Sequence, residues 1–170
     1  MKIREEKGFT LAEVLVSAAI LGVGVMGMAA MQGMAYTKNV DANDLSIVTN
    51  IASDMMERIQ ANRQYAWGYH NLQTLAAGNC AALPAPQPAG VTKPTPIGIT
   101  RVVQGDCTQW RALVLASNLP NIQGQVQVTN AIPANVSLGA RQVVVQIQWN
   151  DRGPGQRLRT INFQTTLVPE

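Results

Sequence analysis

An almost uncharged run of 23 residues, from Phe9 to Met31, constrains this chain more than any other feature. Its sequence is FTLAEVLVSAAILGVGVMGMAAM, and its one charged residue is Glu13. A helix of that length rises about 35 Å, which exceeds the roughly 30 Å of a bilayer's hydrocarbon core. We therefore expect residues 9–31 to form a membrane-spanning helix.

Three basic residues, Lys2, Arg4 and Lys7, precede this run. By the positive-inside rule they hold the N-terminus in the cytoplasm, so we expect the rest of the chain to be exported. The alternative is an ordinary secretory signal that is cleaved among the small residues between Met28 and Gln32. Glu13 counts against that alternative, because the apolar core of a simple signal has no use for a carboxylate.

Composition limits the classes of function. The chain has 170 residues, 46% hydrophobic and 14% charged, which amounts to about one domain and is not typical of disorder. A net charge of +3 is too small to indicate a nucleic-acid protein. The single histidine is His70, and the sequence contains no metal-ligand cluster, phosphate-binding loop, dinucleotide fingerprint or nucleophile elbow. We expect no catalytic residue, no metal, no cofactor and no small-molecule substrate, so the protein is not predicted to be an enzyme.

The two cysteines, Cys80 and Cys107, lie 27 positions apart. With no second cysteine or histidine cluster nearby, a single structural disulfide is the simpler interpretation, and it implies an oxidising compartment. The alternative is two free, buried thiols.

The segment Lys7-Gly8-Phe9-Thr10-Leu11-Ala12-Glu13 resembles the prepilin motif of type IV pilins and type II secretion pseudopilins. The resemblance implies that residues 1–8 are a leader, which a membrane-embedded prepilin peptidase removes after Gly8. It also implies that the mature chain begins at Phe9, whose new amino group is N-methylated. Glycine suits the cleavage site because it has no side chain to obstruct the peptidase.

Glu13 is the residue to which the resemblance gives an assembly role. An acid in a membrane helix is costly and is therefore a functional hypothesis by default. In the family this position pairs with the cationic N-terminal amine of a neighbouring subunit, here the amine of Phe9. The alternative is a carboxylate that reaches the membrane surface without a partner.

The glycine content of the apolar run departs from many major pilins, which place a proline near its middle. This chain has Ala30 near that point and glycines at Gly22, Gly24, Gly27 and Gly33. The departure favours a minor component over a major one.

Residues 32–63 continue as an amphipathic helix in our prediction. Apolar residues recur there at spacings of three and four, with two more widening the stripe: Leu45, Val48, Ala52, Met55 and Ile59, then Ile47 and Ile51. We expect one helix from Phe9 to about Arg63, with the stripe packed against a globular head; a coiled-coil partner is the alternative. The segment from Asp54 to Arg63 also resembles the end of the stem in PilV-type minor pilins, the pilus modification proteins.

The remainder, residues 64–170, is predicted to be a periplasmic head with an α+β, type IV pilin-like fold. Residues 64–105 are predicted to be loop, with an aromatic cluster packed over the stem rather than binding a sugar: Tyr65, Trp67 and Tyr69. Asp106 and Gln109 resemble a capping box, which predicts a short helix ending before Pro120. Alternation of apolar and polar residues predicts three strands, near residues 126–128, 143–149 and 161–167, in an antiparallel sheet.

The function implied by the resemblance is that of a minor pilin of a type IV pilus, PilV-like, which helps initiate assembly or decorates the pilus in twitching and adhesion. The implied partners are the prepilin peptidase, other minor and major pilins, and the inner membrane before assembly into the surface pilus. One alternative is a minor pseudopilin of a type II secretion system. Another is a head that binds DNA or a surface, because it has seven Lys or Arg against three acids.

Overall fold

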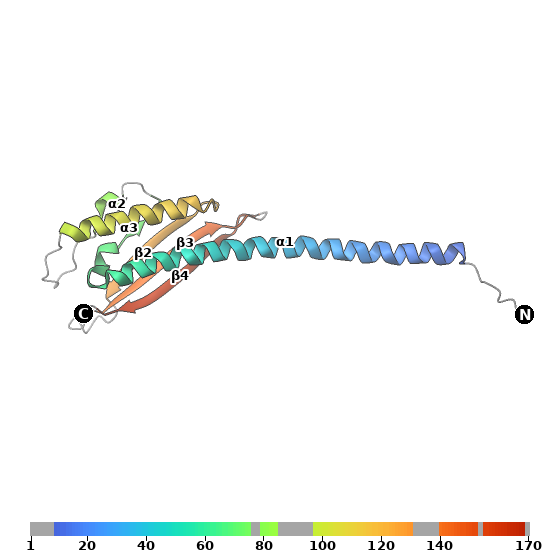
Figure 1. Cartoon of the computed structure of the whole chain (residues 1–170), viewed down its shortest axis with the longest axis horizontal. Coiled ribbons are helices and arrows are strands. Elements are labelled where there is room, and N and C mark those ends of the chain that lie inside the picture. Colours follow the sequence, from blue (N-terminus) through green and yellow to red (C-terminus); the bar gives the residue numbers. More distant parts are fainter. Residues whose placement is uncertain (1–8, 76–78, 85–96, 131–139, 153–154, 169–170) are drawn as a thin grey trace, which may run out of the picture. The chain divides into compact units, whose positions relative to one another are not determined.

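The computed structural model describes residues 9–75, 79–84, 97–130, 140–152 and 155–168. The chain divides into two compact units, Met1–Asn43 and Asp44–Glu170, which are described separately below. The helix α1, Leu11–Ala61, runs through both (Figure 1). Within the described residues this agrees with the long N-terminal helix predicted from the sequence.

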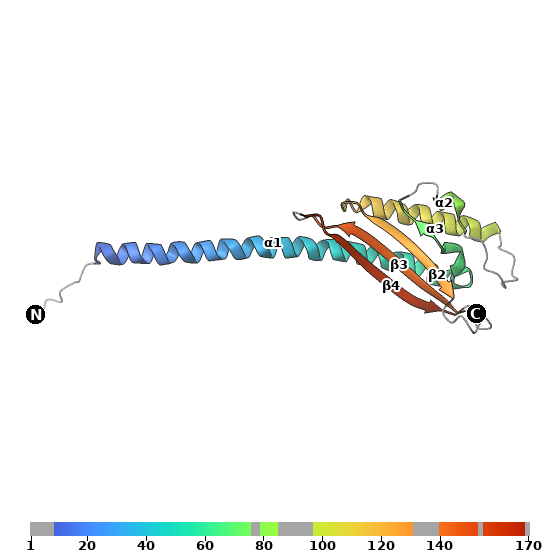
Figure 2. The same cartoon turned by 180° about the vertical axis from the view of Figure 1, so that it is seen from behind.

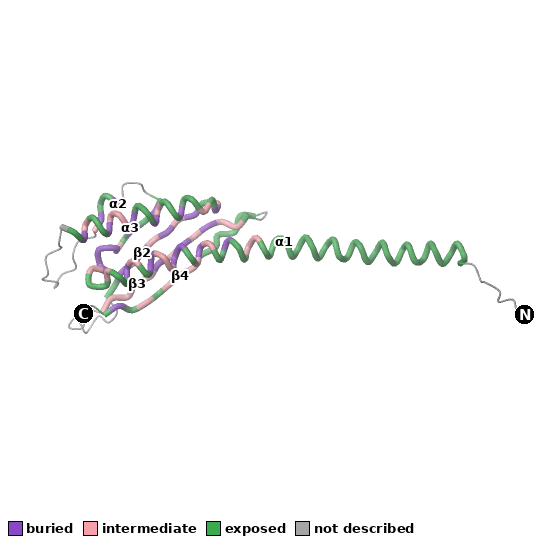
Figure 3. The backbone as a smooth tube through the Cα atoms, in the orientation of Figure 1, coloured by how far each residue is buried: buried purple, intermediate pink, exposed green. Residues whose placement is uncertain are grey.

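In the first unit, α1 is exposed along its whole apolar length (Figure 3). Nothing lies within 4 Å of the Cβ position at Gly22, Gly24, Gly27 or Gly33. No described part of the chain therefore covers this segment. Its apolar surface must be covered by lipid or by another protein, because exposed apolar area on this scale is unfavourable in water.

The second unit is an α+β head. After α1 the described residues form a 3₁₀ helix, two further α-helices and a four-stranded antiparallel sheet in the order β1-β2-β3-β4. The bounds are η1 Arg63–Tyr69, β1 Leu72–Gln73, α2 Asn79–Ala82, α3 Ile97–Ala116, β2 Gln123–Asn130, β3 Arg141–Asn150 and β4 Leu158–Leu167. The sequence therefore predicted the fold class correctly.

The sheet follows from strict alternation in the sequence. Val126 pairs with Val145, and Val145 pairs in turn with Phe163, which places these apolar side chains on one face. The intervening residues, mostly glutamines, face the other way. The helices α1 and α3 cover the apolar face (Figure 1), and the opposite face is seen uncovered from behind (Figure 2).

The core lies between the C-terminal part of α1, α3 and the apolar face of the sheet. Along α1 the buried residues recur with helical spacing: Val48, Ile51, Ala52, Met55, Met56 and Ile59. The prediction that this stripe packs in a core is confirmed for all of these positions except Met56, which is buried but was not part of the predicted stripe. It was wrong at Leu45, which is 48% exposed, because Asp44 rather than Leu45 faces the head at that turn.

Trp110 of α3 fills the centre of the core. Its ring is fully buried, and its indole N–H donates a 2.9 Å hydrogen bond to the carbonyl oxygen of Ile51 in α1. The ring lies against the backbone of Gly124 on β2, where a Cβ atom would come within 2.4 Å of it. Any larger residue at this position would therefore force the Trp110 ring or the strand to shift.

Three local predictions were wrong. Residues 64–105 are not simply a loop, since they contain η1, β1, α2 and the start of α3; Pro86, Pro88, Pro94 and Pro96 lie outside the described residues. The sheet has four strands rather than three, because Leu72 and Gln73 pair with β2. The helix α3 starts at Ile97, so Asp106 and Gln109 lie inside it and do not cap it.

Candidate functional site

The first turn of α1 holds Thr10 and Glu13 in a reciprocal arrangement. The backbone N–H and the hydroxyl of Thr10 donate to Glu13 Oε2 at 3.0 and 3.1 Å, and the backbone N–H of Glu13 donates to Thr10 Oγ1 at 3.3 Å. This is a capping box, which satisfies two N–H groups that a helix start leaves unpaired. Glu13 thus stabilises the start of its own helix.

Thr10 was not among the predicted functional residues, although Thr-x-x-Glu is the sequence pattern of a capping box. The capping box predicted at Asp106 and Gln109 is wrong, because both residues lie inside α3. The predicted processing site consists of Gly8 and Phe9. Phe9 is 87% exposed, and Gly8 lies outside the described residues.

An exposed, mostly apolar strip lies on one side of the first turns of α1. It consists of Phe9, Val14, Ser17, Ala18, Leu21 and Gly22. The small residues Ser17, Ala18 and Gly22 within it would allow another helix to approach closely. Among the described residues α1 is also the one helix long and apolar enough to cross a membrane.

A polar cluster fixes the other end of α1 to the head. The Arg58 guanidinium contacts Asp54 Oδ2 at 2.8 Å and Asp106 Oδ1 at 3.0 Å, and donates to Gln109 Oε1 at 2.7 Å. Asp54 and Arg58 thus form an ion pair between residues four apart on α1. The contact of Arg58 with Asp106 of α3 was not predicted. The two residues lie 48 positions apart in the chain, and only the packing of the two helices brings them together.

Tyr69 of η1 completes this cluster. Its hydroxyl donates to Asp106 Oδ2 at 2.6 Å and accepts from Asn62 Nδ2 at 3.1 Å. Burial, and then the hydrogen bond to Asp106, raise the pKa of Tyr69 well above its usual value. The hydrogen bond to Asp54, together with Asp106, raises the pKa of Arg58. The hydroxyl therefore stays protonated and the guanidinium stays charged.

The predicted disulfide is present. Cys80 of α2 and Cys107 of α3 are bonded at 2.05 Å, with their Cα atoms 5.5 Å apart. The bond links α2 to α3 and so closes a loop that includes the residues between these two helices. Its presence excludes the alternative of two free thiols in this structure.

The aromatic cluster packs in the head, and His70 forms a hydrogen bond to the sheet. Trp67 and Tyr69 are buried and Tyr65 is partly buried against the core, which confirms packing rather than a sugar site. His70 Nδ1 accepts a 3.1 Å hydrogen bond from the backbone N–H of Val128. No group of three or more potential metal ligands occurs in the described part of the chain.

Two of the arginines near the strands form ion pairs with acidic residues. Arg152 contacts Asp44 Oδ2 at 3.5 Å, and Arg159 contacts Asp151 Oδ2 at 3.4 Å. Asp44 is only 4% exposed, so Arg152 compensates a buried carboxylate. These contacts lower the positive charge available to a DNA partner.

The comparisons with known proteins concern the N-terminal segment. Residues 3–29 match the family model described as the prokaryotic N-terminal methylation motif. No curated protein and no solved structure matches the chain. The motif covers the predicted leader boundary, the capping box and most of the exposed apolar helix. The chain therefore carries a type IV prepilin-like signal at its N-terminus, ahead of a head with a type IV pilin-like architecture.

Proposed function

We propose that this protein is a minor pilin of a type IV pilus, held in the inner membrane by α1 before it is assembled. The observation that carries the proposal is the methylation motif over residues 3–29, which includes most of an apolar helical segment that no described residue covers. A subunit of this kind needs a removable leader, a membrane helix that can move into a filament, and an exported head. The chain has sequence and structural features suited to each.

Processing at Gly8 and methylation of Phe9 form the first step of the proposal. The new amino group would lie one residue before the capping box. Thr10 and Glu13 fix the first turn there, so the amine and the Glu13 carboxylate would both lie at the helix end. Cleavage after Gly8 would also remove Lys2, Arg4 and Lys7, leaving the mature N-terminus without basic side chains.

Glu13 is proposed to pair with the Phe9 amine of an adjacent subunit. Its intramolecular bonds to Thr10 use one carboxylate oxygen, Oε2. The other oxygen, Oε1, makes no hydrogen bond within the described residues, so it offers an acceptor to a neighbour. Such a pair would neutralise two charges in an apolar filament core, where either one alone would be costly.

The substitution Glu13→Gln tests this assembly step. We expect the variant to reach the membrane and to be cleaved, because Gln also forms capping boxes. It should be depleted by at least tenfold from sheared pili, because the amine of the neighbour loses its counter-charge. Glu57→Gln, at an exposed position of α1 in the head, is the control and should enter pili normally. Normal incorporation of Glu13→Gln would refute the role of Glu13.

The assignment to a PilV-type minor pilin rests on the resemblance of the segment from Asp54 to Arg63. In the structure three of its residues, Asp54, Arg58 and Asn62, lie four apart and take part in the cluster with Asp106 and Tyr69. The segment therefore holds the head on α1. In the family, minor pilins of this kind prime assembly, and we propose the same role here.

The second candidate is a minor pseudopilin of a type II secretion system, because that class shares the methylation motif. Deleting the gene separates the two. The pilus assignment predicts lost piliation and twitching with normal protein secretion. Lost secretion with intact pili would favour the pseudopilin.

A further inference from the structure

Among the residues that the structure describes, none on the outer face of the sheet, opposite the helices, is charged. Alternation along the four described strands sets which side chains point outward. They are Gln73; Gln123, Gln125, Gln127 and Thr129; Gln142, Val144, Gln146, Gln148 and Asn150; and Leu158, Thr160, Asn162, Gln164 and Thr166. Soluble surfaces usually have about a quarter to a third of charged residues, so a wholly uncharged face calls for a reason.

The amides of this face form a regular array. The strand register aligns Gln73, Gln125, Gln146 and Asn162 in one row across all four strands, and Gln123 with Gln148 in the next. Neighbouring strands lie about 4.8 Å apart, and outward residues repeat about every 6.8 Å along a strand. The result is a lattice of groups that each donate and accept hydrogen bonds.

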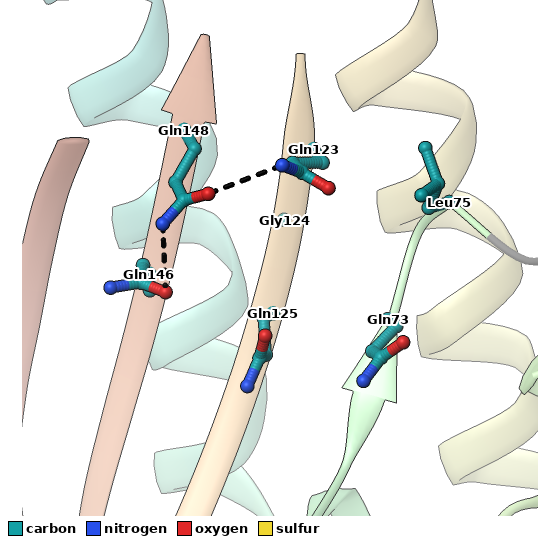
Figure 4. A pocket seen from close by; sticks show the side chains of 7 residues that line it. All are labelled: Gln73, Leu75, Gln123, Gly124, Gln125, Gln146 and Gln148. Atoms are coloured by element: carbon teal, nitrogen blue, oxygen red, sulfur yellow. Dashed lines mark hydrogen bonds between the residues drawn. The ribbon is translucent and has the colours of Figure 1, made fainter. Parts of the chain in front are cut away.

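A chain of hydrogen bonds orients part of this array (Figure 4). Gln123 Nε2 donates to Gln148 Oε1 at 3.1 Å, and Gln148 Nε2 donates to Gln146 Oε1 at 3.3 Å. Gln146 Nε2 then donates to Asn162 Oδ1 at 2.9 Å. Three long side chains are thereby ordered before any ligand arrives, which lowers the entropy cost of binding.

A small pocket lies over the β1 end of the array. Its lining is Gln73, Leu75, Gln123, Gly124, Gln125, Gln146 and Gln148, as Figure 4 shows. The side-chain amides of Gln73 and Gln125 make no hydrogen bond to any described residue. Leu75 stands beside them, and 73% of its surface is exposed. The pocket thus offers free amide donors and acceptors next to one apolar wall.

We propose that this pocket binds a neutral oligosaccharide. A sugar hydroxyl both donates and accepts hydrogen bonds, as an amide does, so the two match without any charge. Leu75 would contact an apolar C–H face of the ring. Nucleic acid fits poorly, because phosphate needs basic side chains and the described strands direct none to this face. The site is separate from the N-terminal segment and does not depend on processing at Gly8.

The test uses the full chain in lauryldimethylamine oxide micelles, since detergents with sugar head groups would compete for the pocket. The probes are maltoheptaose and chitotetraose, with a duplex DNA oligonucleotide as the charged comparison. Saturation-transfer NMR and titration calorimetry measure binding. We expect at least one of the two sugars to bind saturably and the DNA not to bind at this face.

Two substitutions on different strands locate the site. Gln125→Leu and Gln73→Leu each remove both donor and acceptor at nearly constant size, and each should weaken sugar binding at least tenfold. The matched control is Gln127→Leu, on the same strand and face as Gln125 but outside the pocket, and it should bind as wild type. Circular dichroism and the intact disulfide establish that each variant is folded. Absence of saturable binding by either sugar, or equal weakening in Gln127→Leu, would overturn the proposal.

Discussion

Tyr69 shows how single residues join separate elements of the head. Its hydroxyl bridges Asn62 at the end of α1 and Asp106 in α3, and the side chain is fully buried. Its folded-state pKa is raised above the unfolded value of about 10. The stability linked to this proton is therefore fully present below about pH 10 and is lost as the pH rises further.

Tyr69→Phe should therefore make the stability of the head less sensitive to alkaline pH, because phenylalanine has no hydroxyl to ionise. Above about pH 10, the free energy of unfolding of the wild type should fall by up to about 1.4 kcal/mol per pH unit more than that of the variant. At neutral pH the variant should be less stable by about 1–2 kcal/mol, because Asp106 loses a donor. Urea unfolding of the full chain in micelles from pH 7 to 11 measures both. Tyr36→Phe, in the exposed segment, should match the wild type; parallel curves for Tyr69→Phe would contradict the raised pKa.

Gly124 gives a second prediction at this scale. A Cβ atom there would lie 2.4 Å from Trp110, which is itself fixed by its bond to Ile51. Gly124→Ala should therefore lower the free energy of unfolding by about 1–3 kcal/mol through overpacking. Gly105→Ala is the control, since nothing lies within 4 Å of its Cβ position. It should leave stability unchanged or raise it by up to about 1 kcal/mol, because alanine favours the helix.

Some features of single residues can be predicted from local sequence patterns, and others depend on tertiary packing. The Thr10 and Glu13 capping box follows a local four-residue rule and was predictable. Leu45 was misassigned because its spacing fits the stripe, and only the packing of the head decides that Asp44 is buried there instead. The contact of Arg58 with Asp106 joins residues whose proximity depends on tertiary packing, so no local rule gives it.

At the scale of elements, the strands were the easiest to predict. Period-two alternation around Val126, Val145 and Phe163 fixes both the strand and the face that it buries. β1 was not predicted, because a strand of two residues is too short to show an alternation of apolar and polar residues. The start of α3 was missed because Ile97, Thr100 and Val102 are β-branched, although the buried positions Ile99, Val103 and Cys107 recur every four residues.

The disulfide is expected to stabilise the head by restricting its unfolded chain. For a loop of 27 residues the chain-entropy estimate is roughly 3.5 kcal/mol. The double substitution Cys80→Ala and Cys107→Ala should lower the free energy of unfolding by about 2–4 kcal/mol. Wild-type protein unfolded with and without a reductant separates the loss of the bond from the loss of side-chain packing. No difference between oxidised and reduced wild type would contradict the estimate.

For the molecule as a whole, the proposed function requires that the head be exported. A disulfide between Cys80 and Cys107 persists in the periplasm and not in the cytoplasm. In cells that lack the periplasmic thiol oxidase, we expect both thiols to become reactive to maleimide once the head is unfolded. They should be protected in wild-type cells. Reactive thiols in both strains would contradict an exported head.

Prepilin processing is tested by the mass of the N-terminal peptide, from membranes of cells with and without the prepilin peptidase. We expect a chain that begins at N-methylated Phe9 only when the peptidase is present, and at Met1 when it is absent. A chain that begins near Gln32, or one that retains Met1 in both strains, would contradict the assignment to the prepilin class.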